Sequence, residues 1–319
     1  MTGVQTCALP ISVPAPDTVA PVTALSESAK MFVDNKCVIH DVVFDKVLGE
    51  GAFGQVLKGV WQGNIVAAKK TKKFTSQEEL LSEAETCMKV RHPNCVQFFG
   101  IFFADGFAHM VTEFMPLGSL HRLLQLNEFT KYELLGFARD AASGMLYLST
   151  TAKLVHRDLA TRNLLVKQEA ESKYTVKVAD FGLSRSLAPT RTNPEAPTPA
   201  TSASSSDSSE DEYHSTTGLM PYRWTAPEAM KDGTFTTRSD IWSFGVVVWE
   251  IFSRGAQPYA GLSNSEVKTA VMGGQRLSCP RDCPFNVWEA VKGCFNTHGQ
   301  FRPTFDFLHS SLVSVLKQT

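Results

Sequence analysis

The change in hydrophobic periodicity along the chain constrains its fold more than any other feature. Residues 42–48, 55–60 and 65–69 are short strand-like runs separated by turns, and one helical pattern follows over residues 77–90. From Leu117 onward, apolar residues recur at helical spacing. A chain of 319 residues is long enough for two adjoining lobes. We therefore predict an α+β fold with a small β-rich lobe containing one main helix and a larger, mainly α-helical lobe.

Charge and apolar runs exclude two classes of partner. The chain has 32 acidic and 31 basic residues and a net charge of -1, so its overall charge favours neither nucleic acid nor a membrane surface. The longest apolar run, residues 241–252, is short and contains Glu250, which predicts a buried helix and not a membrane span. Partners must therefore be inferred from individual sites.

Seven cysteines are scattered along the chain. The one close pair, Cys279 and Cys283, has no second pair or histidine cluster to complete a metal site, so we expect both to pack as small apolar side chains. This usage is typical of reduced thiols and predicts a cytoplasmic setting.

Three segments differ in composition from the expected packed domain. Residues 1–11 resemble a translated sequencing-library adaptor and are left out of the fold prediction, and residues 12–31 read as a linker. We expect the domain over residues 32–317, with lobes at about 32–115 and 116–317. Within it, residues 187–212 contain four prolines and an acidic serine run but almost no bulky apolar residue, which predicts a disordered insert.

A glycine-rich segment, GEGAFGQV at residues 49–56, lies between two strand-like runs. Glycines there let the backbone turn tightly and approach phosphate oxygens. A dinucleotide-binding fold would require a helix next and an acid about twenty residues on, but that distance reaches Lys69. A strand that carries a cation beneath a glycine loop suits the phosphates of ATP. Glu83, in the helical stretch that follows, is placed to pair with Lys69.

Three later motifs complete an ordered set. They are HRDLATRN at residues 156–163, DFG at 180–182 and APE at 226–228. Together with the glycine segment, the lysine and the glutamate, they make the chain resemble the protein kinase family over about residues 42–316. The resemblance implies a bilobal fold and transfer of a phosphoryl group from ATP with Mg²⁺ as the metal.

The resemblance also implies a role for each catalytic residue. Asp158 would accept the proton of the substrate hydroxyl, while Asn163 and Asp180 would hold Mg²⁺. Lys69 would bind the α- and β-phosphates, and Glu83 would hold Lys69 in position. These groups supply the positioning and the charge neutralisation that phosphoryl transfer requires.

The family pattern further implies a nucleotide pocket. Its apolar walls would be Val56, Ala67 and Leu165, the backbone of residues 113–115 would contact the adenine edge, and Thr112 would be the gatekeeper. Besides Lys69, the expected nucleotide-binding residues are Leu48, Gly49, Gly51, Gly54, Val56, Ala67, Thr112, Glu113, Met115 and Leu165.

Two residues of the larger lobe match structural positions of the family. Asp240 resembles the acid that braces the catalytic loop, and Arg302 resembles the arginine that pairs with Glu228. Both are expected to be buried, where a charged group requires a partner.

The residues around the catalytic motif bear on the acceptor hydroxyl. Serine/threonine kinases usually have a lysine two residues after the catalytic aspartate; here that residue is Ala160, and Arg162 supplies the basic group, as in tyrosine kinases of the receptor type. MPYRW at residues 220–224 resembles their substrate-docking loop, so protein tyrosine is the predicted substrate. Residues 61–63, WQG, resemble the tyrosine-kinase-like serine/threonine group or a simple turn. Serine/threonine or dual specificity, and a catalytically silent scaffold, are the alternatives.

Tyr213 is the predicted activating site. It lies eleven residues before Trp224 and follows the acidic residues 210–212. A phosphate there would add roughly -1.5 to -2 charges and need nearby cations, for which Arg157 and Arg185 are the candidates. Phosphorylation of one copy by another would also require self-association.

Overall fold

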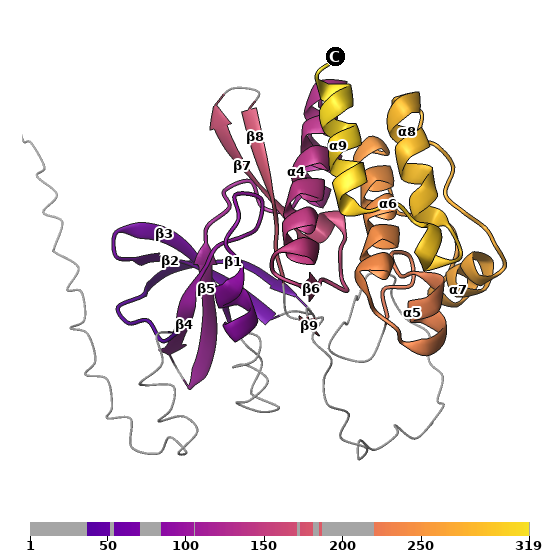
Figure 1. Cartoon of the computed structure of the whole chain (residues 1–319). Coiled ribbons are helices and arrows are strands. Elements are labelled where there is room, and N and C mark those ends of the chain that lie inside the picture. Colours follow the sequence, from indigo (N-terminus) through magenta and orange to yellow (C-terminus); the bar gives the residue numbers. More distant parts are fainter. Residues whose placement is uncertain are drawn as a thin grey trace, which may run out of the picture.

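The computed structural model contains two lobes, one built on an antiparallel sheet and one mainly of helices (Figure 1). The predicted α+β arrangement is therefore confirmed. The structure describes residues 37–51, 54–70, 84–104, 106–170, 173–180, 185–186 and 220–318. Residues 1–11, 12–31 and 187–212 lie outside this part of the chain, so the predictions made for them and the proposed domain limits stay predictions.

The small lobe is a five-stranded antiparallel sheet in the order β1-β2-β3-β5-β4. Its core contains Val66 and Ala68 of β3 and Val111 of β5, all fully buried. Residues 84–89 are helical and belong to the helical stretch expected from the sequence. The strands are β1 (Val43–Gly51), β2 (Gly54–Trp61), β3 (Asn64–Lys70), β4 (Phe98–Ala104) and β5 (Phe107–Glu113).

A two-residue turn joins β2 to β3. Trp61 pairs with Asn64, and the residues between them, Gln62 and Gly63, both have left-handed backbones, with φ of 47° and 77°. Two consecutive positive φ angles are the geometry that matches the twist of a tight hairpin, and glycine adopts it at little cost. The turn therefore accounts for the WQG sequence without any reference to serine/threonine specificity.

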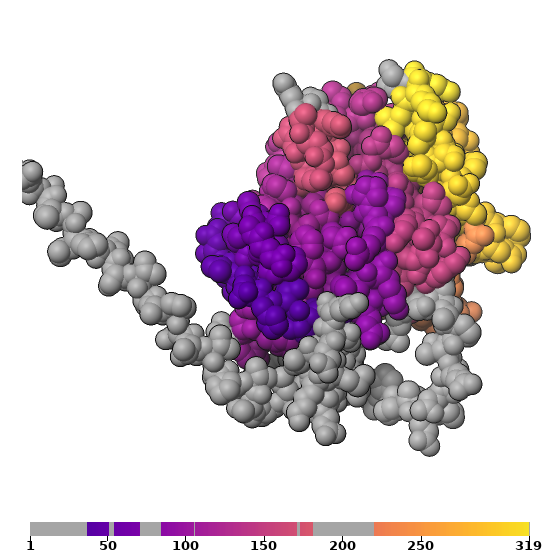
Figure 2. Space-filling view, turned by 60° about the vertical axis from the view of Figure 1, so that its left-hand side comes forward, coloured from indigo at the N-terminus to yellow at the C-terminus, as the bar shows by residue number. Residues whose placement is uncertain are grey.

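The large lobe packs helices around α6 and α4. Two short two-stranded sheets, β6 with β9 and β7 with β8, lie between the lobes (Figure 1). In the view of Figure 2, β1–β3 and α9 lie on opposite sides of the molecule. The helices are α3 (Leu120–Leu126), α4 (Lys131–Thr150), α5 (Pro227–Asp232), α6 (Thr237–Phe252), α7 (Asn264–Met272), α8 (Phe285–Val291) and α9 (Phe305–Leu316). The short strands are β6 (Leu154–Val155), β7 (Leu164–Ala170), β8 (Lys173–Val178) and β9 (Arg185–Ser186), and the 3₁₀ turns are η1 (Thr161–Asn163), η4 (Lys292–Phe295) and η5 (Gly299–Phe301).

Helix α6 forms the centre of the large lobe. Thirteen of its sixteen residues are buried, which confirms that the apolar run at residues 241–252 is a core helix. Its start is fixed by a capping box in which Thr236 and Ser239 exchange hydrogen bonds. Among the described residues, no helix combines the length and the apolar character needed to cross a bilayer.

Of the two neighbouring cysteines, one is buried and one is exposed. Cys283 is buried, and burial raises the pKa of its thiol to about 12. Cys279 is exposed, so the prediction that both pack in the interior is correct for Cys283 and wrong for Cys279. Between the two cysteines, the Cys283 N–H donates to the Pro280 carbonyl at 3.0 Å and closes a turn.

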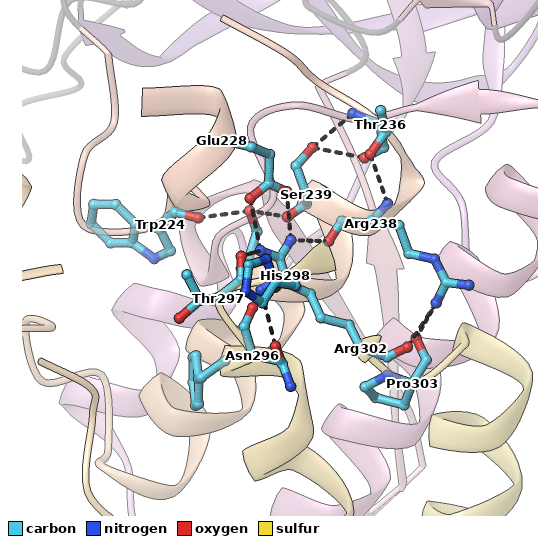
Figure 3. Close-up of polar contacts among 12 residues, drawn as sticks. Trp224, Glu228, Thr236, Arg238, Ser239, Asn296, Thr297, His298, Arg302 and Pro303 are labelled. Atoms are coloured by element: carbon cyan, nitrogen blue, oxygen red, sulfur yellow. Dashed lines mark hydrogen bonds and ion pairs between the residues drawn. The ribbon is translucent and has the colours of Figure 1, made fainter. Parts of the chain in front are cut away.

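A bidentate ion pair joins α5 to the segment before α9 (Figure 3). Arg302 donates through its two terminal nitrogens to the two carboxylate oxygens of Glu228, at 2.6 and 2.7 Å, and through Nε to the Asn296 carbonyl at 2.9 Å. The Arg302 side chain is fully buried, so these acceptors replace all of its hydration. The predicted pairing of Arg302 with Glu228 is confirmed.

We expect Arg302→Met to lower the free energy of unfolding by about 3 kcal/mol, because it removes the donors of the half-buried Glu228 carboxylate and of the Asn296 and Arg238 carbonyl oxygens. Lys292→Met is the matched control, since it removes an exposed pair with Glu289 and should cost under about 0.5 kcal/mol. Urea unfolding of both variants measures the difference. If both variants lost equally little free energy of unfolding, the buried pair would contribute no more to stability than the exposed pair.

Candidate active site

Asp240 of α6 fixes the start of the loop between β6 and β7. Its carboxylate accepts the backbone N–H of His156 at 2.7 Å and that of Arg157 at 3.0 Å. Asp240 is almost fully buried, and burial raises the pKa of its carboxyl, while the backbone hydrogen bonds of His156 and Arg157 and the charge of Arg157 oppose this shift. The loop bends sharply there, with Arg157 in the left-handed region at φ 72°. The bracing contact predicted for Asp240 is thus confirmed.

The His156 ring connects this loop to the strand β8 that leads to Asp180. Nδ1 lies 3.3 Å from the backbone N–H of Asp158, and Nε2 lies 3.0 Å from the Ala179 carbonyl oxygen. Because Nδ1 accepts a hydrogen bond, Nε2 carries the proton and donates it to Ala179. One imidazole therefore sets the spacing between the two acidic segments of the site.

Asp158 is held at both carboxylate oxygens. Arg162 Nη2 lies 2.5 Å from Oδ1, and Asn163 Nδ2 lies 2.9 Å from Oδ2 and 2.7 Å from the Asp158 carbonyl oxygen. The turn η1 places all three residues within one short stretch. The Asp158 side chain is only 4% exposed, so its orientation is strongly determined by these two donors.

Lys69 and Asp180 bring the two lobes together. Lys69 Nζ, on β3, lies 2.9 and 3.1 Å from the carboxylate oxygens of Asp180, which follows β8. Both side chains are partly exposed. Asp180 has a left-handed backbone at φ 60°, a conformation that aspartate tolerates better than most residues. Glu83, the predicted partner of Lys69, lies outside the described residues.

The donor set suits a hard cation. Asn163 uses its amide nitrogen on Asp158, so its amide oxygen is the atom with which it could hold a metal, and Asp180 offers a carboxylate. Mg²⁺ is typically held by one or two such oxygen ligands, with water and phosphate oxygens completing the shell. Among the described residues, no group of three or more His, Cys, Asp or Glu side chains is arranged to hold a metal ion.

Strand register gathers the expected nucleotide residues on one face of the sheet. Val56 lies opposite Lys69, and Ala67, two residues before Lys69, lies opposite Thr112. Since side chains two apart in a strand point the same way, all four face one side. Leu165 packs with Met115, Val96 and Ala179 in a separate apolar cluster.

The remaining glycine-loop residues lie on the β1–β2 hairpin. Gly49 pairs with Val56, and Gly51 pairs with Gly54. Leu48 precedes them and is exposed. The hairpin therefore ends in glycines beside β3, as the sequence predicted.

Lys177 is a site residue that the sequence reasoning missed. It lies three residues before Asp180, and its Nζ is 2.7 and 2.8 Å from the carboxylate oxygens of Glu113. Glu113 also accepts the backbone N–H of Gln97 at 2.7 Å. The end of β5 is therefore tied to β8. Nothing in the spacing of Lys177 and Glu113 indicates this pairing.

Residues 42–312 match the protein-family model for the protein tyrosine and serine/threonine kinases. The chain belongs to this kinase family. Over 268 residues it is 39% identical to the tyrosine protein-kinase src-1 of Caenorhabditis elegans, an alignment that covers 82% of this chain and 46% of src-1.

Two further relatives support the assignment. The kinase is 34% identical over 278 residues to protein-tyrosine kinase 6 of Mus musculus, covering 85% of this chain and 56% of the relative. It is 35% identical over 277 residues to the tyrosine-protein kinase SRK3 of Spongilla lacustris, covering 85% of this chain and 75% of SRK3. The chain thus spans about half the length of src-1 and of protein-tyrosine kinase 6.

The kinase's predicted regulatory residues are only partly described. Tyr213 lies outside the described residues. The Arg157 guanidinium carbon is 5.4 Å from the centre of the Phe235 ring. The backbone of Arg185 pairs with Val155 in the β6–β9 sheet.

We expect Gly54→Ala to weaken ATP binding by about tenfold, roughly 1.4 kcal/mol. A Cβ at Gly54 would lie 2.6 Å from the Lys70 carbonyl oxygen, and φ is +100°, so alanine must displace the glycine hairpin. Gly63→Ala is the control: φ is +77°, but the space around its Cβ is open and the turn is at the other end of β2. Calorimetric titration with ATP measures both. Equal affinity losses would argue against a role of the Gly54 hairpin in binding phosphate.

Proposed function

We propose that this chain is a protein-tyrosine kinase that transfers the γ-phosphate of ATP to tyrosine hydroxyls. The observation that carries the proposal is the clamp on Asp158, in which Arg162 supplies the cation and Asn163 the amide. The names of the three relatives above, all tyrosine kinases, support the same acceptor.

Each polar group of the candidate active site has a task in this reaction. Lys69 would bind the α- and β-phosphates, Asn163 and Asp180 would hold Mg²⁺, and Asp158 would orient the substrate hydroxyl and accept its proton. Bound ATP and Mg²⁺ supply the phosphoryl group and neutralise its developing charge. Because the clamp leaves Asp158 nearly covered, a hydroxyl must displace part of this cover to reach the carboxylate.

The residues around Asp158 support tyrosine as the acceptor. Ala160 has no cation to contact the γ-phosphate beside the acceptor, and the cation at Asp158 comes instead from Arg162 of η1. The guanidinium of Arg162 lies over the Trp224 ring, 4.4 Å from its centre. Trp224 ends the MPYRW segment proposed to dock the substrate, so the clamp and the docking segment are in direct contact.

Asp158→Asn should lower kcat for a tyrosine peptide by about 10²–10⁴-fold while ATP affinity changes little, because only the proton acceptor is lost. The exposed Asp306→Asn on α9 is the control and should keep wild-type rates. Radiolabelled transfer to matched peptides with tyrosine or serine as the acceptor measures both activity and specificity. Wild-type rates in Asp158→Asn would refute the catalytic assignment, and preferential labelling of serine would favour serine/threonine specificity. No transfer by the wild-type chain would favour the scaffold.

We also propose that phosphorylation of Tyr213 activates the kinase. Arg157 precedes Asp158, and the backbone of Arg185 pairs with the strand that leads to Arg157, so the two arginines come from adjacent chain segments. A phosphate bound by both would tie the activation segment to the catalytic loop.

Incubation of wild-type protein with Mg²⁺ and ATP should produce phosphate on Tyr213 and remove an initial lag in peptide phosphorylation. Tyr213→Phe should keep the initial lag, because phenylalanine cannot be phosphorylated and so cannot add the charge that the arginines would bind. Peptide mapping and time courses at several protein concentrations measure the site and show whether one copy phosphorylates another. Full activation of Tyr213→Phe, or phosphate on serines alone, would contradict the switch.

A further inference from the structure

Glu250 is the one acid in the apolar run of residues 241–252, and it is 1% exposed. Its Oε2 accepts the backbone N–H of Thr161 at 3.1 Å and the indole N–H of Trp224 at 2.9 Å, and its Oε1 accepts the Thr161 hydroxyl at 2.8 Å. Burial raises the pKa of Glu250, while these hydrogen bonds and the charge of Arg162 oppose the shift. A buried acid with three donors from two distant segments organises both segments.

Both segments lead to Arg162. Thr161 is the residue immediately before it, so Glu250 fixes the backbone from which the arginine projects. Trp224 presents its ring face to the guanidinium at 4.4 Å, so the indole hydrogen bond fixes the surface on which the arginine rests. Arg162 in turn contacts Asp158 at 2.5 Å. Glu250 thus holds Arg162 in two ways. It fixes the backbone at Thr161, next to Arg162, and it fixes the Trp224 ring that the Arg162 guanidinium contacts.

We infer that Glu250 is a positioning residue for phosphoryl transfer, which holds Arg162 against Asp158 through Thr161 and Trp224. The inference rests on the proposed function, in which Asp158 receives the substrate hydroxyl. It adds a coupling between two parts of the kinase: the docking segment must be in place for the arginine clamp to be complete.

The groups around Glu250 show which substitution would keep its hydrogen bonds and which would remove them. His121 of α3 lies with Nδ1 3.9 Å from Oε1 and 3.4 Å from the Thr161 hydroxyl, and burial lowers the pKa of its imidazole, with a further lowering by Arg162. Both His121 and the Thr161 hydroxyl can accept as well as donate. In Glu250→Gln, the amide oxygen can therefore still accept from the Trp224 and Thr161 N–H groups. The amide nitrogen can donate to the Thr161 hydroxyl or to His121. Methionine fills a similar volume but keeps none of these bonds.

The test compares Glu250→Gln and Glu250→Met, each with Arg162 intact and with Arg162→Ala. With Arg162 intact, Glu250→Met should lower kcat about 10–100-fold, the scale of a misplaced catalytic group, and Glu250→Gln should stay within about threefold of wild type. With Arg162→Ala, Glu250→Met should cause no further fall, because its effect passes through the arginine. ATP affinity should stay unchanged throughout.

Two tryptophans, one bonded to Glu250 and one next to it in the sequence, give a second measure. Trp224→Phe removes the N–H that binds Glu250 and should lower kcat only when Arg162 is present. Trp249→Phe removes a comparable N–H bond to the Ser278 carbonyl at 3.1 Å, away from the arginine, and should leave kcat unchanged. If Glu250→Met fails to fold, as judged by melting and ATP binding, the Trp224→Phe pair decides the question alone.

The outcomes separate this inference from the proposed function. An undiminished kcat in Glu250→Met, or an equal fall with and without Arg162, overturns the positioning role. A Glu250→Gln variant as impaired as Glu250→Met, with ATP affinity intact, overturns its hydrogen-bond basis. If Asp158→Asn and Arg162→Ala both transfer phosphate at wild-type rates, the proposed catalytic site itself is wrong.

Discussion

Two buried carboxylates of the core helix α6 need hydrogen-bond donors, and this need fixes the conformation of the loop between β6 and β7. Asp240 and Glu250 are each about 1% exposed, and neither can remain charged there without hydrogen-bond donors. Asp240 takes the backbone N–H groups of His156 and Arg157, and Glu250 takes that of Thr161. The loop is therefore attached to α6 on both sides of Asp158. The core of the lobe and the geometry of the site are parts of one hydrogen-bonded arrangement.

The other lobe supplies its part through strand register. Because Val56, Ala67 and Lys69 face the same side of the sheet, the cation and the apolar positions expected for adenine share one surface. The contact between Lys69 and Asp180 then brings this surface to the end of β8. The ion pair of Glu113 with Lys177 is a second link from β5 to β8. Charge complementarity, in addition to apolar packing, thus sets how the lobes meet at the site.

How far the sequence predicts the structure depends on the range of each interaction. Asp158, Arg162 and Asn163 were predicted from the resemblance of their motif to that of protein kinases, and because they lie within six residues they also come together in space. The apolar run at residues 241–252 predicted the buried helix α6. Contacts such as Glu113 with Lys177 depend on strand register across two lobes, which no local pattern contains. Glu250 did give a signal, since an isolated acid in an apolar run requires buried partners, but the sequence does not say which ones.

The attachment of the loop to α6 also determines how the kinase can open locally. The amides of His156, Arg157 and Thr161 donate to carboxylates that have no solvent contact of their own. Freeing any of these amides while α6 stays folded would leave a buried charge with an unfilled acceptor, at a cost of several kcal/mol. The loop therefore has no cheap route to partial opening. We expect the loop to unfold together with α6 as one cooperative unit, so that the rigidity of Asp158 depends on the stability of the core helix.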